Sequence, residues 1–165
     1  MGRRQAREAA LRTLYQVDVG GIESEAAIKN TTEINETLEE EADRVGPLGQ
    51  DDLAFAREII FGTIKNKNEI DSIIAGISRD WNVERLARVD HNIMRMAVFE
   101  IMHRDDIPFS VTVNEAVDLA KTYGSDESGK FVNGILGMVT RNSKTMNHVS
   151  ESNIVQDPTM IKEEL

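Results

Sequence analysis

Apolar residues recur every three to four positions along most of this chain, which is the spacing of an amphipathic α-helix. The first such segment, residues 3–19, places Ala6, Ala10 and Leu14 on one face, and two glycines follow it. No run of alternating apolar and polar residues between turn signals predicts a β-strand. The pattern therefore predicts an all-α protein, a compact bundle of about six or seven helices.

The middle of the chain continues this spacing. We expect a helix capped by Asp51 or Asp52 that reaches Ile64, a polar break over 65–68, and a second helix through Ile77.

Residues 89–102 are apolar on most sides, which predicts a central helix buried over most of its surface. Before it we expect a turn at Trp81 and Asn82 and a short helical turn over 83–87.

Two further helices are predicted in the last third of the chain. One is capped by Ser110 or Thr112 and ends at Tyr123, and the other starts at Ser125 or Asp126.

Gly134 and Gly137 lie one turn apart in the last helix. This spacing indicates close backbone packing, because glycine otherwise costs a helix about 1 kcal/mol. From about residue 142 the hydrophobic period fades. The sequence thus predicts a helical domain over 1–141 and a flexible, disordered tail over 142–165.

Composition narrows the class of protein. The chain has 165 residues and no cysteine, which favours one domain without disulfides or thiolate metal sites. Residues 23–43 are strongly acidic and predict an exposed helix, followed by a loop over 45–49. No apolar run approaches the roughly 18 residues of a membrane helix, and the N-terminal segment does not resemble a signal peptide. We therefore expect a cytoplasmic protein without a membrane partner.

Arginines at the start of the chain contradict its overall charge. The formal net charge is -10, yet four of the first dozen residues are arginine: Arg3, Arg4, Arg7 and Arg12. Such a cluster is either an anion site or an arm that keeps the helix start soluble. Arg4 and Arg12 face outward on the helix. Arg7 shares the heading of Leu14 at the edge of the buried stripe, which favours a pairing with a carboxylate of another helix.

Candidates for catalysis are weak. His91, His103 and His148 lack the spacing of metal ligands, and exposed histidines are expected. Glu115 and Asp118 share one helix face, which is typical of a solvated surface rather than of acid–base chemistry. Nothing assembles a nucleophile, a base and an orienting group, and no glycine-rich phosphate loop occurs, so we expect neither an enzyme nor a cofactor.

Two further positions could join a basic surface. Lys130 stands beside Phe131 near a helix start, where the ring either stacks on an unpaired base or belongs to the core. Arg95 borders the central apolar stripe, as a rim residue or as part of the same surface.

Four segments together carry a family resemblance. Residues 3–16, 89–100, 113–124 and 130–136 resemble, in matching order, the NusB family of bacterial transcription antitermination factors. The resemblance implies an all-helical fold of two small subdomains and a non-enzymatic role. It also implies a partnership with NusE, a ribosomal small-subunit protein. The pair would hold the boxA segment of nascent ribosomal RNA so that RNA polymerase reads through terminators.

Carried onto this chain, the resemblance implies a split RNA site, with phosphate contacts from arginines and base stacking from aromatic rings. Its residues are Arg3, Arg4, Arg7, Arg12, Tyr15, Arg95, Glu127, Lys130 and Phe131. The same domain also occurs ahead of an RNA cytosine methyltransferase, and because this chain ends at Leu165 we expect the stand-alone factor. The alternative is a helical protein-interaction scaffold without direct RNA contact, whose acidic surface binds the partner.

Overall fold

The computed structural model describes residues 2–33, 48–78 and 86–155, with side chains for 3–31, 48–78 and 86–143. Those residues form seven helices and no strand, so the all-α prediction is confirmed. The helices are α1 (Gly2–Gly20), α2 (Ser24–Glu33), α3 (Gln50–Lys65), α4 (Lys67–Ile77), α5 (Arg88–His103), α6 (Phe109–Tyr123) and α7 (Asp126–Val155).

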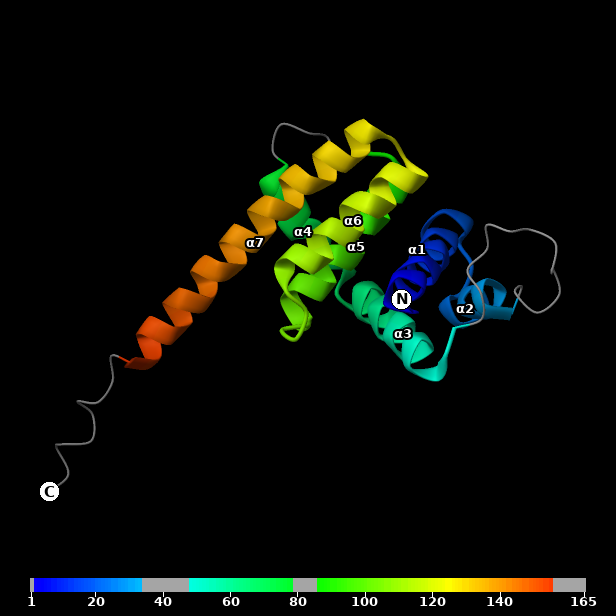
Figure 1. Cartoon of the computed structure of the whole chain (residues 1–165), viewed down its shortest axis with the longest axis horizontal. Coiled ribbons are helices and arrows are strands. Elements are labelled where there is room, and N and C mark those ends of the chain that lie inside the picture. The colour runs from blue at the N-terminus through cyan, green and yellow to red at the C-terminus, as the bar shows by residue number, and fades with distance from the viewer. Residues whose placement is uncertain (1, 34–47, 79–85, 156–165) are drawn as a thin grey trace, which may run out of the picture.

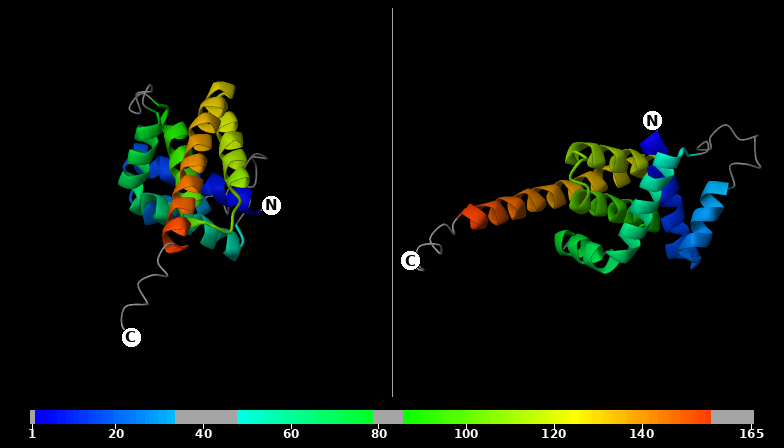
Figure 2. Two further views of the ribbon diagram at one scale, coloured as in Figure 1. Left: turned by 90° about the vertical axis from the view of Figure 1, so that its left-hand side faces the viewer. Right: turned by 90° about the horizontal axis from the view of Figure 1, so that it is seen from below.

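The helices form two groups that meet at α5. Helices α1, α2 and α3 pack together, and α4, α6 and α7 pack around α5 (Figure 1). The groups join where α1 and α3 contact α5, and the two further views show the same division (Figure 2). This arrangement agrees with the two helical subdomains that the resemblance implies. Among the described residues, no helix is long and apolar enough to cross a membrane.

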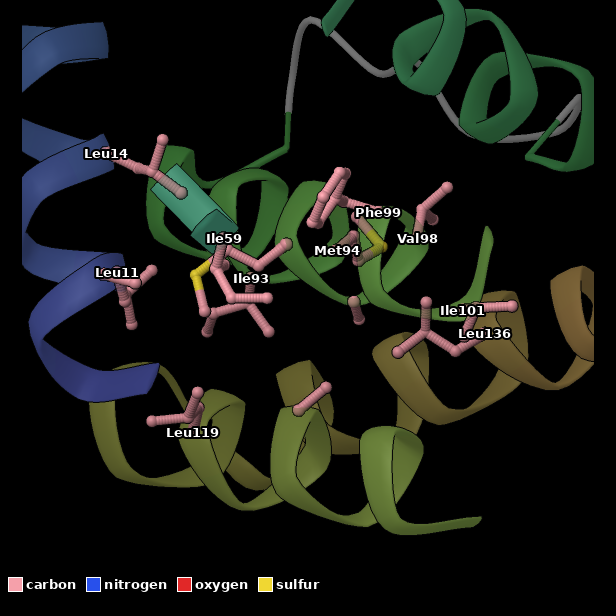
Figure 3. Packing of buried hydrophobic residues seen from close by; sticks show 14 of the residues in the cluster. Leu11, Leu14, Ile59, Ile93, Met94, Val98, Phe99, Ile101, Leu119 and Leu136 are labelled. Atoms are coloured by element: carbon pink, nitrogen blue, oxygen red, sulfur yellow. The ribbon is translucent and has the colours of Figure 1, made fainter. Parts of the chain in front are cut away.

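Helix α5 is the centre of the core. Every residue from Asp90 to Ile101 is buried, as the two-sided apolar pattern predicts. Side chains of the surrounding helices converge on it, among them Leu11 of α1, Ile59 of α3 and Leu136 of α7 (Figure 3). Burying a side chain of this size stabilises a fold by about 1.5–3 kcal/mol. The core therefore holds the two groups in one unit.

The predicted caps of α3 and its break from α4 have different outcomes. Gly49 is the N-cap and no side chain caps the helix, so the expected capping by Asp51 or Asp52 is wrong. Both aspartates lie in the first turn instead, where a negative charge is favoured by the helix dipole. The predicted break is confirmed, because α3 ends at Lys65 and α4 begins at Lys67.

Helix α6 also begins earlier than predicted. Its N-cap is Pro108, without a side-chain cap, so capping by Ser110 or Thr112 is wrong. A proline fits there because its fixed φ suits a helix start and its missing N–H is not needed. Helix α7 begins at Asp126, as predicted, and the backbone N–H of Ser128 donates to the Ser125 hydroxyl over 3.2 Å.

The predicted glycine pair of α7, Gly134 and Gly137, does not mark close packing. A Cβ on Gly134 would meet no atom within 4 Å, and one on Gly137 would meet only the end of the Arg141 side chain at 3.5 Å, so that prediction is wrong. The close approach lies at Gly62 in α3, where a Cβ would overlap the ring of Phe99. Glycine is therefore required between α3 and α5, and the close approach in α7 lies at Gly129, where a Cβ would come within 2.8 Å of the Lys121 side chain.

Helix α7 continues past its predicted end near residue 142 to Val155. The fading hydrophobic period led to the prediction of a tail, but a helix does not require an apolar stripe, since helicity and burial are separate properties. Other predictions fall on residues 34–47, 79–85 and 156–165, outside the described residues: the rest of the acidic segment, most of the loop after it, the turn at Trp81 and the final tail. Of the predicted turn before α5, only Leu86 and Ala87 are described, and they are not helical.

Candidate nucleic-acid interface

Two arginines of α1, Arg3 and Arg4, are exposed. The helical pattern predicted this for Arg4. Arg4 donates from Nη2 to the Asp118 carboxylate over 2.7 Å, and its Nε lies 3.5 Å from Glu115. Arg3 lies over the ring of Phe55, with its guanidinium carbon 4.8 Å from the ring centroid. Exposed pairs of this kind contribute only about 0–1 kcal/mol, so a phosphate can replace the carboxylates of Arg4 at little cost.

Arg7 takes the pairing that its place on the helix favoured. The residue is only 5 % exposed, its Nε donates to Glu100 Oε2 over 3.2 Å, and its Nη2 pairs with the other carboxylate oxygen. The Thr112 hydroxyl donates to that same oxygen over 3.1 Å. Three helices therefore meet at one buried carboxylate, and the Arg7 guanidinium does not face solvent.

Arg12 reaches from α1 to the end of α6. Its Nη2 donates to the Tyr123 hydroxyl over 3.2 Å. Because this partner is neutral, the bond orients the guanidinium without cancelling its charge. Arg12 and Tyr123 line a pocket of about 420 Å³, and its other lining residues are Leu11, Tyr15, Gln16 and Val89.

A second hollow lies at the start of α1. It encloses about 590 Å³ between that helix and the loop before α6, with Arg3 and Arg4 on one side and Pro108 and Val111 on another. Glu115 also lines it, so its surface carries both signs of charge. The arginine-bearing face thus has two concave regions, one at each end of α1.

Arg95 is not a rim residue, and its expected place on a basic surface is wrong. It is 4 % exposed and donates to Asp71 of α4 over 2.7 and 2.9 Å. Its Nη1 lies 3.5 Å from Asp18 of α1. Burial of a charged head so deep requires paired charges, and the two aspartates supply them.

His91 is buried rather than exposed, which also corrects the prediction. Its Nε2 lies 3.0 Å from Asp71. Burial, together with the positive charge of Arg95, lowers the pKa of His91, although Asp71 opposes that change. Burial raises the pKa of Asp71, but hydrogen bonds and charge from Arg95 outweigh it and hold the pKa below its usual range. His91 is thus part of a structural network, and no group of three potential metal ligands occurs in the described part of the chain.

The start of α7 carries the other predicted site residues. Glu127 and Lys130 are exposed, whereas Phe131 is partly buried and packs against the core. Helix α6 connects this region to α1, because it packs along α7 and its Asp118 and Tyr123 side chains contact arginines of α1. The predicted residues of α1 and α7 therefore flank α6.

Sequence reasoning missed two residues of this face, Gln16 and Tyr123. Tyr123 was visible only as the end of a predicted helix. The single available signal was its place just before Gly124, where α6 stops and a side chain can turn toward α1.

These features describe an all-helical interaction protein with an arginine- and tyrosine-bearing face. The NusB family model matches residues 4–141. A transcription antitermination protein NusB from Pelotomaculum thermopropionicum is 50% identical over 139 residues, which cover 84% of this chain and 89% of that protein. One from Desulforamulus reducens is 45% identical, covering 86% of this chain and 92% of that protein. The chain belongs to the NusB family, whose members are transcription antitermination factors and not enzymes, and this confirms the resemblance.

Solved structures agree with this assignment. A T. maritima NusB structure superposes with a TM-score of 0.72 at 33% identity and covers 84% of this chain and 90% of that one. A crystal structure of antitermination factors NusB and NusE in complex with dsRNA gives a TM-score of 0.72 at 26% identity and covers 86% of this chain and 97% of that one.

Proposed function

We propose that this protein binds boxA-containing single-stranded RNA of nascent ribosomal transcripts together with NusE, and that the complex lets RNA polymerase read through terminators. Its place of action is the cytoplasm. Family membership and the related NusB–NusE–dsRNA complex support this function. The observation that carries it is local: α1 bears the exposed Arg3 and Arg4 and the half-buried Arg12, whose partner is neutral, on a chain whose net charge is -10.

Arg3, Arg4 and Arg12 are the phosphate-contacting residues of this proposal. Arg4 exchanges its carboxylate partners for phosphate, and the half-buried Arg12 is held by a neutral partner that leaves its charge available. Tyr15, which is 42% exposed, provides a stacking surface for a base. Lys130 adds charge from α7.

Phe131 and Glu127 complete the site from α7. Phe131 offers the edge of a partly buried ring, and Glu127 accepts hydrogen bonds from bases or sugars.

Arg7 and Arg95 act differently from the other predicted residues. Both are buried and paired, Arg7 of α1 with Glu100 of α5, and Arg95 of α5 with Asp71 of α4 and Asp18 of α1. They position α1 against α5, and thereby the exposed arginines, without touching RNA.

The acidic surface has a role in selectivity. It repels phosphate away from the arginine-bearing face, and it attracts a basic ribosomal protein. NusE binding then adds positive charge, so RNA affinity is weak for this chain alone and rises with NusE.

The test is the salt dependence of RNA binding, measured with NusE and without it. For single-stranded RNA, each neutralised phosphate contributes about -0.7 to the slope of log K against log salt. Replacing Arg3 and Arg4 together by alanine should therefore flatten the slope by about 1.4. Arg57→Ala is the matched control, because Arg57 is an exposed arginine of α3 that also pairs with a carboxylate, Glu25.

The scaffold alternative gives the opposite result. It requires that NusE binds normally while the double variant and the native protein have the same RNA affinity and slope. That outcome would remove RNA contact from the function of this face.

A further inference from the structure

Two carboxylates of α6 hold the guanidinium of Arg4. Glu115 and Asp118 lie three residues apart, so one face of α6 carries both. The Nη2 of Arg4 donates to Asp118 Oδ2 over 2.7 Å, and its Nε lies 3.5 Å from Glu115 Oε2. The side chains of Arg4 and Asp118 are 54% and 51% exposed, so a dissolved anion can reach the same guanidinium.

The other two arginines of the proposed site have uncharged partners. Arg3 lies over the Phe55 ring at 4.8 Å, and Arg12 donates to the Tyr123 hydroxyl over 3.2 Å. A phosphate can approach either of these guanidiniums without displacing an anion. At Arg4 it has to displace one, because that guanidinium already has negatively charged partners on α6.

A contact that RNA has to break lowers the affinity for RNA. The apparent affinity of a ligand falls in proportion to the fraction of the protein that is ready to bind it, which here is the fraction in which Arg4 is free of α6. An exposed ion pair changes such a fraction by up to about fivefold. The contact between Arg4 and α6 therefore opposes RNA binding by up to that factor.

We propose that Asp118 and Glu115 of α6 are an internal competitor of RNA for Arg4, and that they set the RNA affinity of this chain. The inference rests on the proposed RNA-binding function. It gives a role to two acidic residues that are not among those implied by the family resemblance. The role is repulsive, since α6 contributes carboxylates that the bound RNA displaces instead of groups that it contacts.

Asp118→Asn tests the closer of the two contacts. The variant keeps the size of the side chain and removes its charge. Its affinity for a boxA-containing single-stranded RNA, measured with NusE, should rise by about twofold to fivefold, the range of an exposed ion pair. Glu25→Gln is the matched control, because Glu25 of α2 holds the exposed Arg57 of α3 in a pair of similar length, 3.0 Å. It also removes one negative charge and should leave RNA affinity unchanged.

A double-mutant cycle separates the contact with Arg4 from a general effect of charge. Removing a carboxylate near the RNA also weakens long-range repulsion, and that effect does not need Arg4. In the background of Arg4→Ala the gain from Asp118→Asn should therefore vanish, because the two changes remove the same interaction. Thermal unfolding of each variant checks that the fold is retained.

The outcomes separate the two proposals. If RNA binds with the expected salt slope but Asp118→Asn gives no gain, or gives the same gain with Arg4→Ala as without it, α6 does not compete for Arg4 and this inference is overturned. If the native protein with NusE shows no affinity for the RNA, the proposed function itself fails.

Discussion

Arg7 of α1 and Glu100 of α5 are each other's buried counter-ion across the boundary between the two helical groups. At the other end of α1 the acidic residue lies on α1 and the arginine on α5, since Asp18 of α1 lies 3.5 Å from Arg95 of α5. Each helix thus contributes one arginine and one acidic residue. The two ion pairs fix both the distance and the register between α1 and α5.

Removing Arg7 should destabilise the protein strongly. Arg7→Ala leaves the buried Glu100 carboxylate with only the Thr112 hydroxyl, and breaking a buried pair typically costs about 3–5 kcal/mol. Arg4→Ala, at the exposed arginine of the same helix, should cost no more than about 1 kcal/mol. Urea unfolding of both variants measures the difference. Equal losses for the two would contradict the structural role of Arg7.

The network around His91 should make stability depend on pH. Its pKa is lowered from 6.5 in the folded protein, so the unfolded chain binds the proton more readily. The contribution is complete above pH 6.5 and is lost as pH falls below that value. The pKa of Asp71, lowered from 3.8, adds a second loss in the same direction below pH 3.8. Unfolding free energies measured across this range should show both steps.

Substitution at His91 isolates the first step. His91→Gln should abolish the decline that begins below pH 6.5, whatever its effect on stability at neutral pH. His103→Gln, at the exposed histidine of α5, should retain it. A decline that persists in the His91 variant would assign it to another group.

Two glycines should respond oppositely to alanine. Gly62→Ala brings a methyl group into the Phe99 ring and should cost about 1–3 kcal/mol through overpacking. Gly134→Ala meets open space in mid-helix and should stabilise α7 by about 0.5–1 kcal/mol. Thermal unfolding compares them. Combining Gly62→Ala with Phe99→Leu should recover part of the loss, and no recovery would point to the backbone instead of the ring.

A substitution at Phe131 should distinguish a role of the ring in protein stability from a role in RNA binding. Phe131→Leu keeps an apolar side chain against the core and should cost less than about 1.5 kcal/mol. If the ring also stacks on RNA, the same change should weaken RNA binding by about fivefold or more. Binding and unfolding measured on one preparation distinguish the two roles. Unchanged RNA affinity would make Phe131 a core residue only.

Periodicity predicted the fold well because burial and helical spacing are both local properties. The stripe of α1, the buried α5 and the break between α3 and α4 follow from it. It failed where a partner from another helix decides the outcome. Nothing near Arg95 in the sequence shows that Asp71, on α4, encloses its guanidinium. The polar residues after 142 gave no packing signal, yet α7 continues to Val155.

The candidate site was predicted in outline, because helical phase is also a local property of the sequence. Helical phase placed Arg4 outward and Arg7 at the core edge, and both positions are confirmed. Phase alone could not find the pocket that Tyr15 and Tyr123 line, since its lining residues come from α1, α5 and α6, which are far apart in the sequence.

The reciprocal pairing of α1 and α5 also constrains how the chain can vary over evolution. Any single substitution at Arg7 passes through a protein with an uncompensated internal carboxylate, so the requirement to fold alone should hold this position fixed. Arg3 and Arg4, in exposed contacts, are under no such constraint from folding. The basic motif at the head of this chain therefore combines, within a single turn of helix, one arginine that folding constrains with two that it leaves open to change.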